Sequence, residues 1–188
     1  VITKVNQFIK PYADQGLITK IQTDTYRREL ERYGFNSIEI AESIFFTDSL
    51  ATLQLLDAIE GEEGEQIRWQ FAVRCVDEFL DHFKLNGNEK LALLEQLKNA
   101  FIREHSESKG LKIQLDTKFR HVRKQVDNIL NRERDATREI RPLMDLLEWK
   151  SNQLQPLADQ ILMLQKNNQL QVSLTDLIAS YTHMMINR

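Results

Sequence analysis

The chain has 188 residues, 41% of them hydrophobic and 28% charged, and its 25 basic and 28 acidic residues give a net charge of -3. This composition is typical of a folded globular protein, and the near-neutral charge excludes a general basic surface for nucleic acid or anionic membranes. A chain of this length is expected to form a single domain, residues 1–188, with a substantial core.

The single cysteine, Cys75, excludes a disulfide framework, and its apolar neighbours predict a buried free thiol. No apolar run approaches the roughly 20 residues that a membrane-spanning helix needs, and no secretory leader opens the sequence. We therefore expect a cytoplasmic protein without a membrane span.

Only three prolines and six glycines interrupt the chain, and most segments have helical periodicity, which predicts a mainly α protein. Apolar residues at helical spacing predict a first helix that ends before Gly16. Residues 18–27 instead mix β-branched and aromatic residues with polar ones and have no helical stripe. They predict a short extended strand, so that the helical domain would be part of an α+β domain.

The middle of the chain, residues 36–58, is interpreted as two helices. Asn36 or Ser37 would cap the first, and the pair Asp48 and Ser49 would cap the second. A glycine- and glutamate-rich stretch, residues 60–64, is expected to be a surface loop. The next helix, residues 65–83, has a broad apolar face and is expected to lie at the centre of the core.

The second half of the chain predicts four further helices. Asn88 is expected to cap a helix over residues 91–101, and a polar linker follows at 103–110. Residues 115–129 and 140–164 predict two long helices that pack as an antiparallel pair, with Pro156 bending or splitting the second. A last helix begins after Ser173 and is expected to pack on the core.

No dinucleotide, phosphate-loop or zinc motif is present, so neither a metal site nor a cofactor is expected. Three histidines, His82, His105 and His121, are expected to be ordinary surface residues. His183 lies on the last helix, one turn before Asn187, which places both side chains on one face. On sequence alone it is more simply a core or boundary residue, but an imidazole with an ordinary pKa of about 6.5 is also suited to proton transfer.

Residues 25–34, TYRRELERYG, concentrate three arginines, two glutamates and two tyrosines before a glycine. The simpler interpretation is a solvated segment whose charges pair locally. In the alternative, Arg28, Glu29 and Arg32 converge beside a substrate, where the planar guanidinium groups would bind carboxylates.

Three motifs in order along the chain resemble one family, the C-terminal domain of lantibiotic dehydratases, also called the thiopeptide-type bacteriocin biosynthesis domain. They are Tyr26-x-x-Glu29-x-x-Arg32-Tyr33-Gly34, Ala41-Glu42-x-x-Phe45-x-x-Asp48-Ser49 and His183-Met184-x-x-Asn187-Arg188.

The resemblance implies β-elimination of glutamate from glutamylated serine or threonine of a precursor peptide, which leaves dehydroalanine or dehydrobutyrine. It implies that His183, Arg32 and Glu29 are the catalytic residues, with His183 as acid or base. The supporting substrate-binding residues would be Arg28, Tyr26, Asn187 and Arg188. The implied partner is a glutamylation domain, on the same or another chain, that uses glutamyl-tRNA, and the sequence permits a homodimer.

The chain departs from the family pattern in lacking a β-rich stretch with a further active-site arginine, so we expect it to be a fragment that need not be active alone. Three alternatives remain open. One is a pyridine-forming cyclase of thiopeptide assembly, the second an aminoacyl-tRNA-dependent peptide-modifying domain, and the third a non-catalytic helical peptide-binding module. Elimination requires Arg32 and His183 to face one site within about 10 Å, whereas a binding module would leave both in solvent beside an apolar groove.

Overall fold

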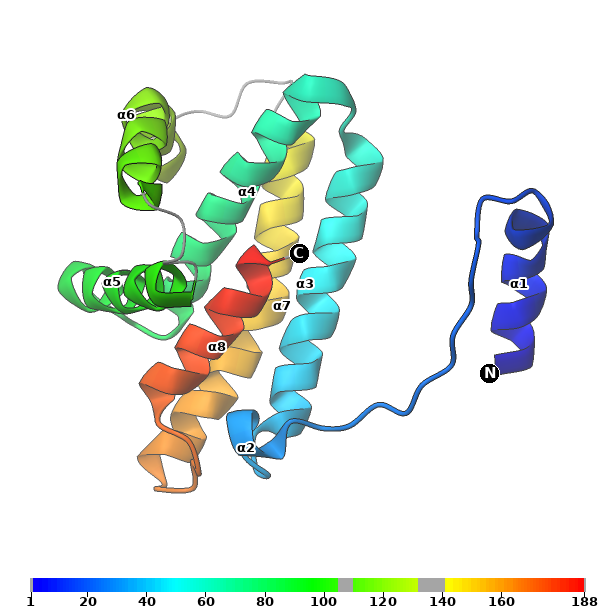
Figure 1. The fold of residues 1–188 in the computed structure, drawn as a ribbon. Helices are drawn as coiled ribbons and strands as arrows, with labels where there is room; N and C mark the ends of the chain where they lie inside the picture. The colour runs from blue at the N-terminus through cyan, green and yellow to red at the C-terminus, as the bar shows by residue number, and fades with distance from the viewer. Residues whose placement is uncertain (1, 105–109, 132–140, 188) are drawn as a thin grey trace.

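The protein was analysed as a computed structural model that describes residues 2–104, 110–131 and 141–187 (Figure 1). The described residues are mainly α, as the sequence predicts, and contain no strand. Their helices, in chain order, are α1 (Ile2–Asp14), α2 (Leu30–Tyr33), α3 (Ile38–Ala58), α4 (Gly61–His82), α5 (Gly87–Glu104), α6 (Leu111–Leu130), α7 (Arg141–Lys166) and α8 (Leu174–Ile186).

The centre of the molecule is a bundle of α3, α4, α7 and α8, in which α7 runs antiparallel to α3 and parallel to α4 (Figure 1). Long antiparallel helices were expected, but the predicted pairing of residues 115–129 with 140–164 was wrong. Helix α7 packs on α3 and α4, whereas α6 packs on α4. The apolar stripes of α6 and α7 predicted two amphipathic helices correctly but contained no information on which helix each would face.

The main core is formed where α3, α4, α7 and α8 meet. Its members share nearly complete burial, and the largest of them are Tyr181, Phe79, Ile44, Leu80, Ile161, Leu177 and Ile178. Full burial of a leucine- or phenylalanine-sized side chain contributes about 1.5–3 kcal/mol. The predicted packing of the last helix on the core is confirmed. The core therefore contains residues from both the first and the last helix of the bundle, α3 and α8.

Helix α3 is continuous through Asp48, so the predicted division of residues 36–58 into two helices was wrong. Asp48 is 2% exposed and lies in the middle of the helix rather than at a cap. The predicted loop over 60–64 was also wrong in part, because α4 begins at Gly61. An Asp–Ser pair is typical of a helix start, where its side chains meet solvent or accept hydrogen bonds from free backbone N–H groups. Here the Asp48 carboxylate instead pairs with a side chain that is distant in the sequence.

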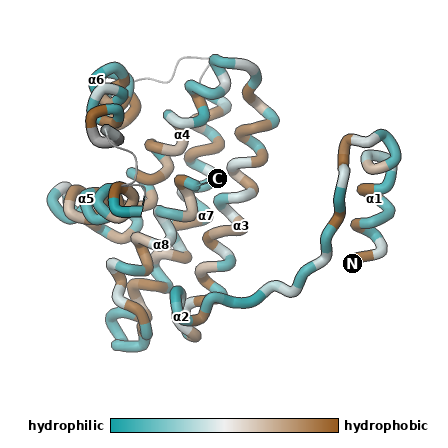
Figure 2. The backbone as a smooth tube through the Cα atoms, in the orientation of Figure 1, coloured by the Kyte–Doolittle hydropathy of each residue, from teal (hydrophilic) through white to brown (hydrophobic). Residues whose placement is uncertain are grey.

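The expected strand over residues 18–27 is not formed, and residues 18–29 have neither helical nor strand structure. A strand requires a neighbouring strand for its backbone hydrogen bonds, and the described residues supply none. Helix α1 lies apart from the bundle at the far end of this connection and has no buried residue (Figure 1). Hydrophobic positions on α1 and the connection are visible in Figure 2, away from the core.

The helix boundaries follow local side chains. Ser173 caps α8 as predicted, because its Oγ accepts a hydrogen bond from the backbone N–H of Asp176 at 3.1 Å. Helix α5 is capped by Asn86 rather than Asn88, since Asn86 Oδ1 accepts from the N–H groups of the second and third residues that follow it. Helix α7 is continuous through Pro156, which is exposed. The helix is therefore not split at Pro156, which was one of the two outcomes that the sequence predicted.

Candidate functional site

The first motif segment is attached to the start of α3 by Arg28. Its Nη2 lies 2.9 Å from Glu42 Oε2, and its Nη1 lies 3.6 Å from Glu39 Oε1. Tyr26 also reaches Glu42, and a loss of hydration, together with the hydrogen bond to that carboxylate, raises the pKa of its phenol. Two of the four substrate-binding candidates are therefore engaged with α3 rather than pointing freely into solvent.

Arg32 and Glu29 form an ion pair at the start of α2, with 3.2 Å between Arg32 Nη1 and Glu29 Oε2. The side chain of Arg32 is 44% exposed and that of Glu29 60% exposed. An ion pair this open to water contributes at most about 1 kcal/mol, so a competing carboxylate could displace Glu29 at small cost. The guanidinium group remains accessible.

The short helix α2 ends at Gly34, which has φ of +74°. A Cβ atom there would lie 3.2 Å from Ser37 Oγ and 3.3 Å from Gln171 Oε1. Gln171 Oε1 also accepts hydrogen bonds from the backbone N–H groups of Phe35 and Asn36. Both the left-handed backbone and the close approach explain why the motif ends in glycine.

The second group of candidates lies on α8. Asn187 Nδ2 is 2.8 Å from His183 Nε2, which confirms that the two side chains share a face of the helix. Because an amide N–H only donates, the imidazole nitrogen accepts, and His183 is exposed rather than part of the core. Arg188, the remaining candidate, lies outside the described residues.

A stack of two tyrosines joins the motif segments. The rings of Tyr33 and Tyr181 are 5.7 Å apart and inclined by only 6°, and Phe45 packs edge-on against both. Tyr33 directly follows Arg32, and Tyr181 precedes His183 by two residues. Burial raises the pKa of both phenols, and each therefore stays neutral at physiological pH.

Of the three catalytic candidates, Arg32 and Glu29 contact each other, whereas His183 belongs to a separate pair on α8, although α2 packs on α8. In the parts of the chain that the structure describes, Arg32 pairs with Glu29 and His183 pairs with Asn187, and no hydrogen bond or ion pair joins the two groups. The ring stack fixes the backbones of α2 and α8 against each other. The side chains of Arg32 and His183 are both exposed.

A buried ion pair that sequence analysis missed lies deeper in the bundle. Lys150 Nζ is 2.6 Å from Asp48 Oδ1, and their side chains are only 5% and 3% exposed. Burial raises the pKa of the nearby Cys75 thiol to about 11, so the predicted buried free cysteine is confirmed and stays protonated at neutral pH. The signal was present in the sequence, because Asp48 and Lys150 each occupy a position of the buried stripe of their helix.

Next to this ion pair is a cavity of about 510 Å³, lined by residues of α3, α4, α5, α6, α7 and α8. Its walls are mainly apolar and include Trp69, Phe71 and Met185. A cavity of this size, with a few polar groups on an apolar wall, is typical of a ligand pocket.

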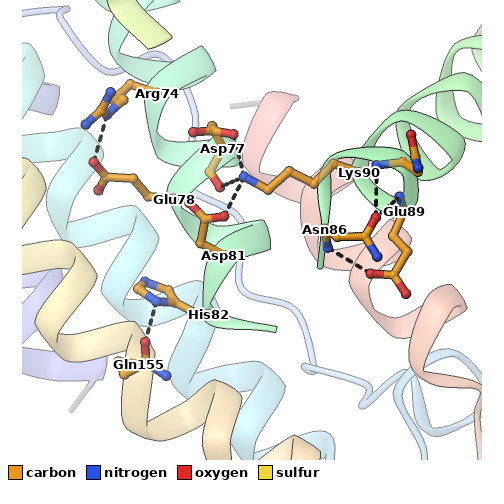
Figure 3. Close-up of polar contacts among 10 residues, drawn as sticks. Arg74, Asp77, Glu78, Asp81, His82, Asn86, Glu89, Lys90 and Gln155 are labelled. Carbon is orange, nitrogen blue, oxygen red and sulfur yellow. Dashed lines mark hydrogen bonds and ion pairs between the residues drawn. The ribbon is translucent and has the colours of Figure 1, made fainter. Parts of the chain in front are cut away.

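A polar cluster around His82 lies on α4, where Figure 3 shows it facing Gln155 of α7. His82 Nδ1 is 2.7 Å from Gln155 Oε1, and Ser151 Oγ is 3.2 Å from His82 Nε2. At 8% exposure His82 is buried, so its expected surface position was wrong, whereas His121 is exposed as expected and His105 lies outside the described residues. Lys90 bridges Asp77 and Asp81 in the same view, at 2.6 Å from each carboxylate.

Two kinds of feature are absent from residues 2–104, 110–131 and 141–187. No three His, Cys, Asp or Glu side chains there are grouped as metal ligands. No helix there is long and apolar enough to cross a membrane.

Comparison with known proteins gives one match. The family model described as the C-terminal part of lantibiotic biosynthesis dehydratases matches residues 1–188. No curated protein and no solved structure matches the chain.

Proposed function

The chain belongs to the family of C-terminal domains of lantibiotic biosynthesis dehydratases, and from this membership we propose that it removes glutamate from a glutamylated precursor peptide. A precursor peptide is the substrate that the family implies. The reaction is a β-elimination at a serine or threonine whose hydroxyl oxygen carries a glutamyl ester. Its product is a dehydrated residue and free glutamate.

The elimination consists of three bond changes. A base removes the Cα proton of the modified residue, the electron pair of that bond forms the Cα–Cβ double bond, and the Cβ–O bond breaks as glutamate leaves with its carboxylate. His183 is the base in this proposal: its imidazole is exposed, and the Nε2 lone pair, which accepts from the Asn187 amide in this structure, takes the Cα proton when the substrate displaces that amide. Proton removal next to the peptide carbonyl builds up negative charge, which a cationic group must stabilise.

Arg32 is the residue that holds the departing glutamate. Its guanidinium already binds a carboxylate, that of Glu29, at 3.2 Å and in a solvent-accessible position. A glutamate leaving group presents the same chemical group as the Glu29 side chain, so it would compete for the same N–H donors. Glu29 would then be released to accept a hydrogen bond from the substrate.

The observation that carries the proposal is the Tyr33–Tyr181 stack, which brings the helix that follows Glu29 against the helix that carries His183. The segments that carry Tyr33 and Tyr181 are far apart in the sequence. If each acted independently on the surface, a direct contact between them would not be required. Elimination requires base and carboxylate-binding group to act on one residue at the same time.

The test is mass spectrometry of a chemically glutamylated precursor peptide after incubation with the protein and three variants. Arg32→Ala is expected to abolish loss of glutamate, whereas Arg27→Ala, which removes an exposed arginine from the same segment, is expected to leave it unchanged. His183→Ala is expected to leave the glutamylated peptide intact. Equal dehydration by all variants would contradict the assignment of these residues.

The proposal also places the protein in a sequence of reactions. Its substrate must come from a transferase that esterifies serine and threonine with glutamate, which we assign to a glutamylation domain on the same or a partner chain that uses glutamyl-tRNA. Because aminoacyl-tRNA is a cytoplasmic donor, the proposed location is the cytoplasm.

A second candidate is a non-catalytic peptide-binding module. It is favoured by the exposure of both Arg32 and His183 and by the apolar cavity described above. The two functions differ in one result, because a binding module would retain the glutamylated peptide without changing its mass.

A further inference from the structure

The cavity beside the buried ion pair shares Asp48 with the second motif, is not lined by Arg32, Glu29 or His183, and has two chemically different parts. Its apolar walls come from five helices, with Leu55 of α3, Trp69 of α4, Leu94 of α5, Leu130 of α6 and Met185 of α8 among them. At about 510 Å³ it lies within the range of roughly 300–1,000 Å³ that is usual for ligand pockets. It is large enough for more than one apolar side chain.

Several charged residues line the cavity, among them Arg68 and the paired Asp77 and Lys90, and the most deeply buried cation is the ammonium group of Lys150. Burial alone lowers the pKa of this lysine, but Cys75 and Asp48 more than offset that effect, so the net pKa is raised. Because Cys75 stays protonated at neutral pH, Asp48 supplies the counter-charge. Lys150 therefore lines a mainly apolar part of the pocket as an ammonium group.

Lys150 has hydrogen-bonding capacity beyond its buried partners. An ammonium group has three N–H donors. In the described part of the chain one is used by Asp48 at 2.6 Å and another by the Cys75 side chain. A buried donor without a partner is costly, so a ligand that supplies an acceptor at the charged end of the cavity is favoured over one that is apolar throughout.

The cavity is also next to the helix that carries His183. Met185 and Ile186 line it, and they lie on the same last turn of α8 as His183 and Asn187. A peptide bound there would continue along the end of α8, and successive residues of an extended peptide advance by about 3.3 Å. The cavity is therefore well placed to anchor a peptide whose other residues reach the exposed imidazole.

We propose that this cavity binds a short run of apolar residues in the precursor peptide, with a backbone carbonyl of the peptide accepting a hydrogen bond from Lys150. The inference rests on the proposed function for the identity of the peptide. Its chemical content, an apolar peptide segment with one acceptor at the charged end, comes from the walls and from Lys150.

Trp69 provides a direct measurement of binding. The chain has two tryptophans, and Trp149→Phe leaves Trp69, which lines the cavity, as the only fluorophore of its kind. The probe is acetyl-Leu-Phe-Leu-amide, and acetyl-Ser-Gly-Ser-amide is its polar control. A saturable change in Trp69 fluorescence is expected with the apolar probe alone. Equal responses to both probes, or tighter binding of decanoate than of the peptide, would overturn the proposal.

Two variants test the site itself. Ala72→Phe fills the cavity from its wall and is expected to weaken tripeptide binding at least tenfold, whereas Leu53→Phe on exposed α3 surface should not change it. The double substitution Asp48→Leu with Lys150→Met removes the donor without leaving an unpaired buried charge, and it is also expected to weaken binding at least tenfold. Unchanged affinity in either cavity variant, with the fold retained by circular dichroism, would refute the site.

The test of the cavity proposal can be distinguished from the test of the elimination chemistry. With Ala72→Phe, the KM for a long glutamylated peptide that contains an apolar run is expected to rise, while turnover of a short glutamylated peptide is unchanged. If the unmodified protein turns over neither peptide, elimination fails but the fluorescence result still decides the cavity. If His183→Ala abolishes turnover and Ala72→Phe leaves both KM values unchanged, the elimination proposal stands and the cavity proposal falls.

Discussion

Gly34 is the residue whose backbone most directly fixes the first motif. Its φ of +74° costs a side-chain-bearing residue about 1–2 kcal/mol, and a Cβ would also crowd Ser37 and Gln171. Gly34→Ala is therefore expected to lower the free energy of unfolding by about 1–2 kcal/mol in urea denaturation. The matched control is Gly87→Ala, since a Cβ there meets no atom within 4 Å. Equal stability of both variants would contradict this explanation of Gly34.

Lys150 is expected to be the most sensitive charged residue. Lys150→Ala leaves Asp48 as an uncompensated buried charge, which costs about 3–5 kcal/mol. Lys166→Ala removes an exposed lysine from the last turn of the same helix and is expected to have little effect. The free energies of unfolding of the two variants, from denaturant titrations, should therefore differ widely. Similar values would mean that the Asp48–Lys150 pair is not closed to water.

Cys75 is expected to be chemically inert while the protein is folded. Burial raises its pKa from 9.0 to about 11, so the thiolate that reacts is scarce at pH 8 and increases only as the pH rises toward that value. The expected result is slow modification by a disulfide reagent in buffer and fast modification in denaturant. Because the folded pKa is the higher one, the contribution of the protonated thiol to stability is complete below pH 9 and is lost as the pH rises toward 11. Rapid labelling of the folded protein at pH 8 would contradict the burial.

At the scale of helices, the contact between α2 and α8 predicts a specific response to mutation. The Tyr181 hydroxyl is buried, and within the described residues it has no hydrogen-bond partner. Tyr181→Phe keeps the ring stack and removes an unsatisfied polar group, so stability is expected to stay equal or rise by up to about 1 kcal/mol. Tyr181→Leu removes the stack and is expected to lower the melting temperature. A clear loss of stability in the phenylalanine variant would reveal a partner for the hydroxyl.

The sequence predicted which segments form helices, but it did not predict which helices pack against one another. Periodicity predicted the central and terminal helices because it reflects one buried face per helix. It failed at Asp48, where an apparent cap is a buried residue paired with Lys150 from α7, and at residues 18–27, where β-rich composition found no neighbouring strand. Those outcomes depend on residues far away in the chain, which local patterns do not contain.

The sequence predicted the candidate site only in part. The resemblance identified both motif segments, and spacing predicted that His183 and Asn187 share a face, as they do. Neither identified the Tyr33–Tyr181 stack or the cavity, because each requires side chains from separate helices to converge. Convergence of that kind is a property of tertiary packing.

At the scale of the molecule, α1 and the connection after it contribute no buried residue to the bundle. Deleting residues 2–16 is therefore expected to leave the melting temperature of the bundle almost unchanged, because no core contact is lost. Thermal unfolding followed by circular dichroism measures this, with deletion of residues 174–187 as the opposite control, since α8 is part of the core. A large drop on removing α1 would show that α1 packs on the bundle.

The tyrosine stack also has a consequence for the order in which the protein folds. The ring that covers Tyr33 belongs to α8, which is synthesised after α3 to α7, so α2 has its full set of neighbours only after α8 has docked. Contacts between residues so distant in sequence form late, because a long loop must close before they are made. A nascent chain that has not yet released α8 from the ribosome would therefore have a largely helical bundle but no assembled site.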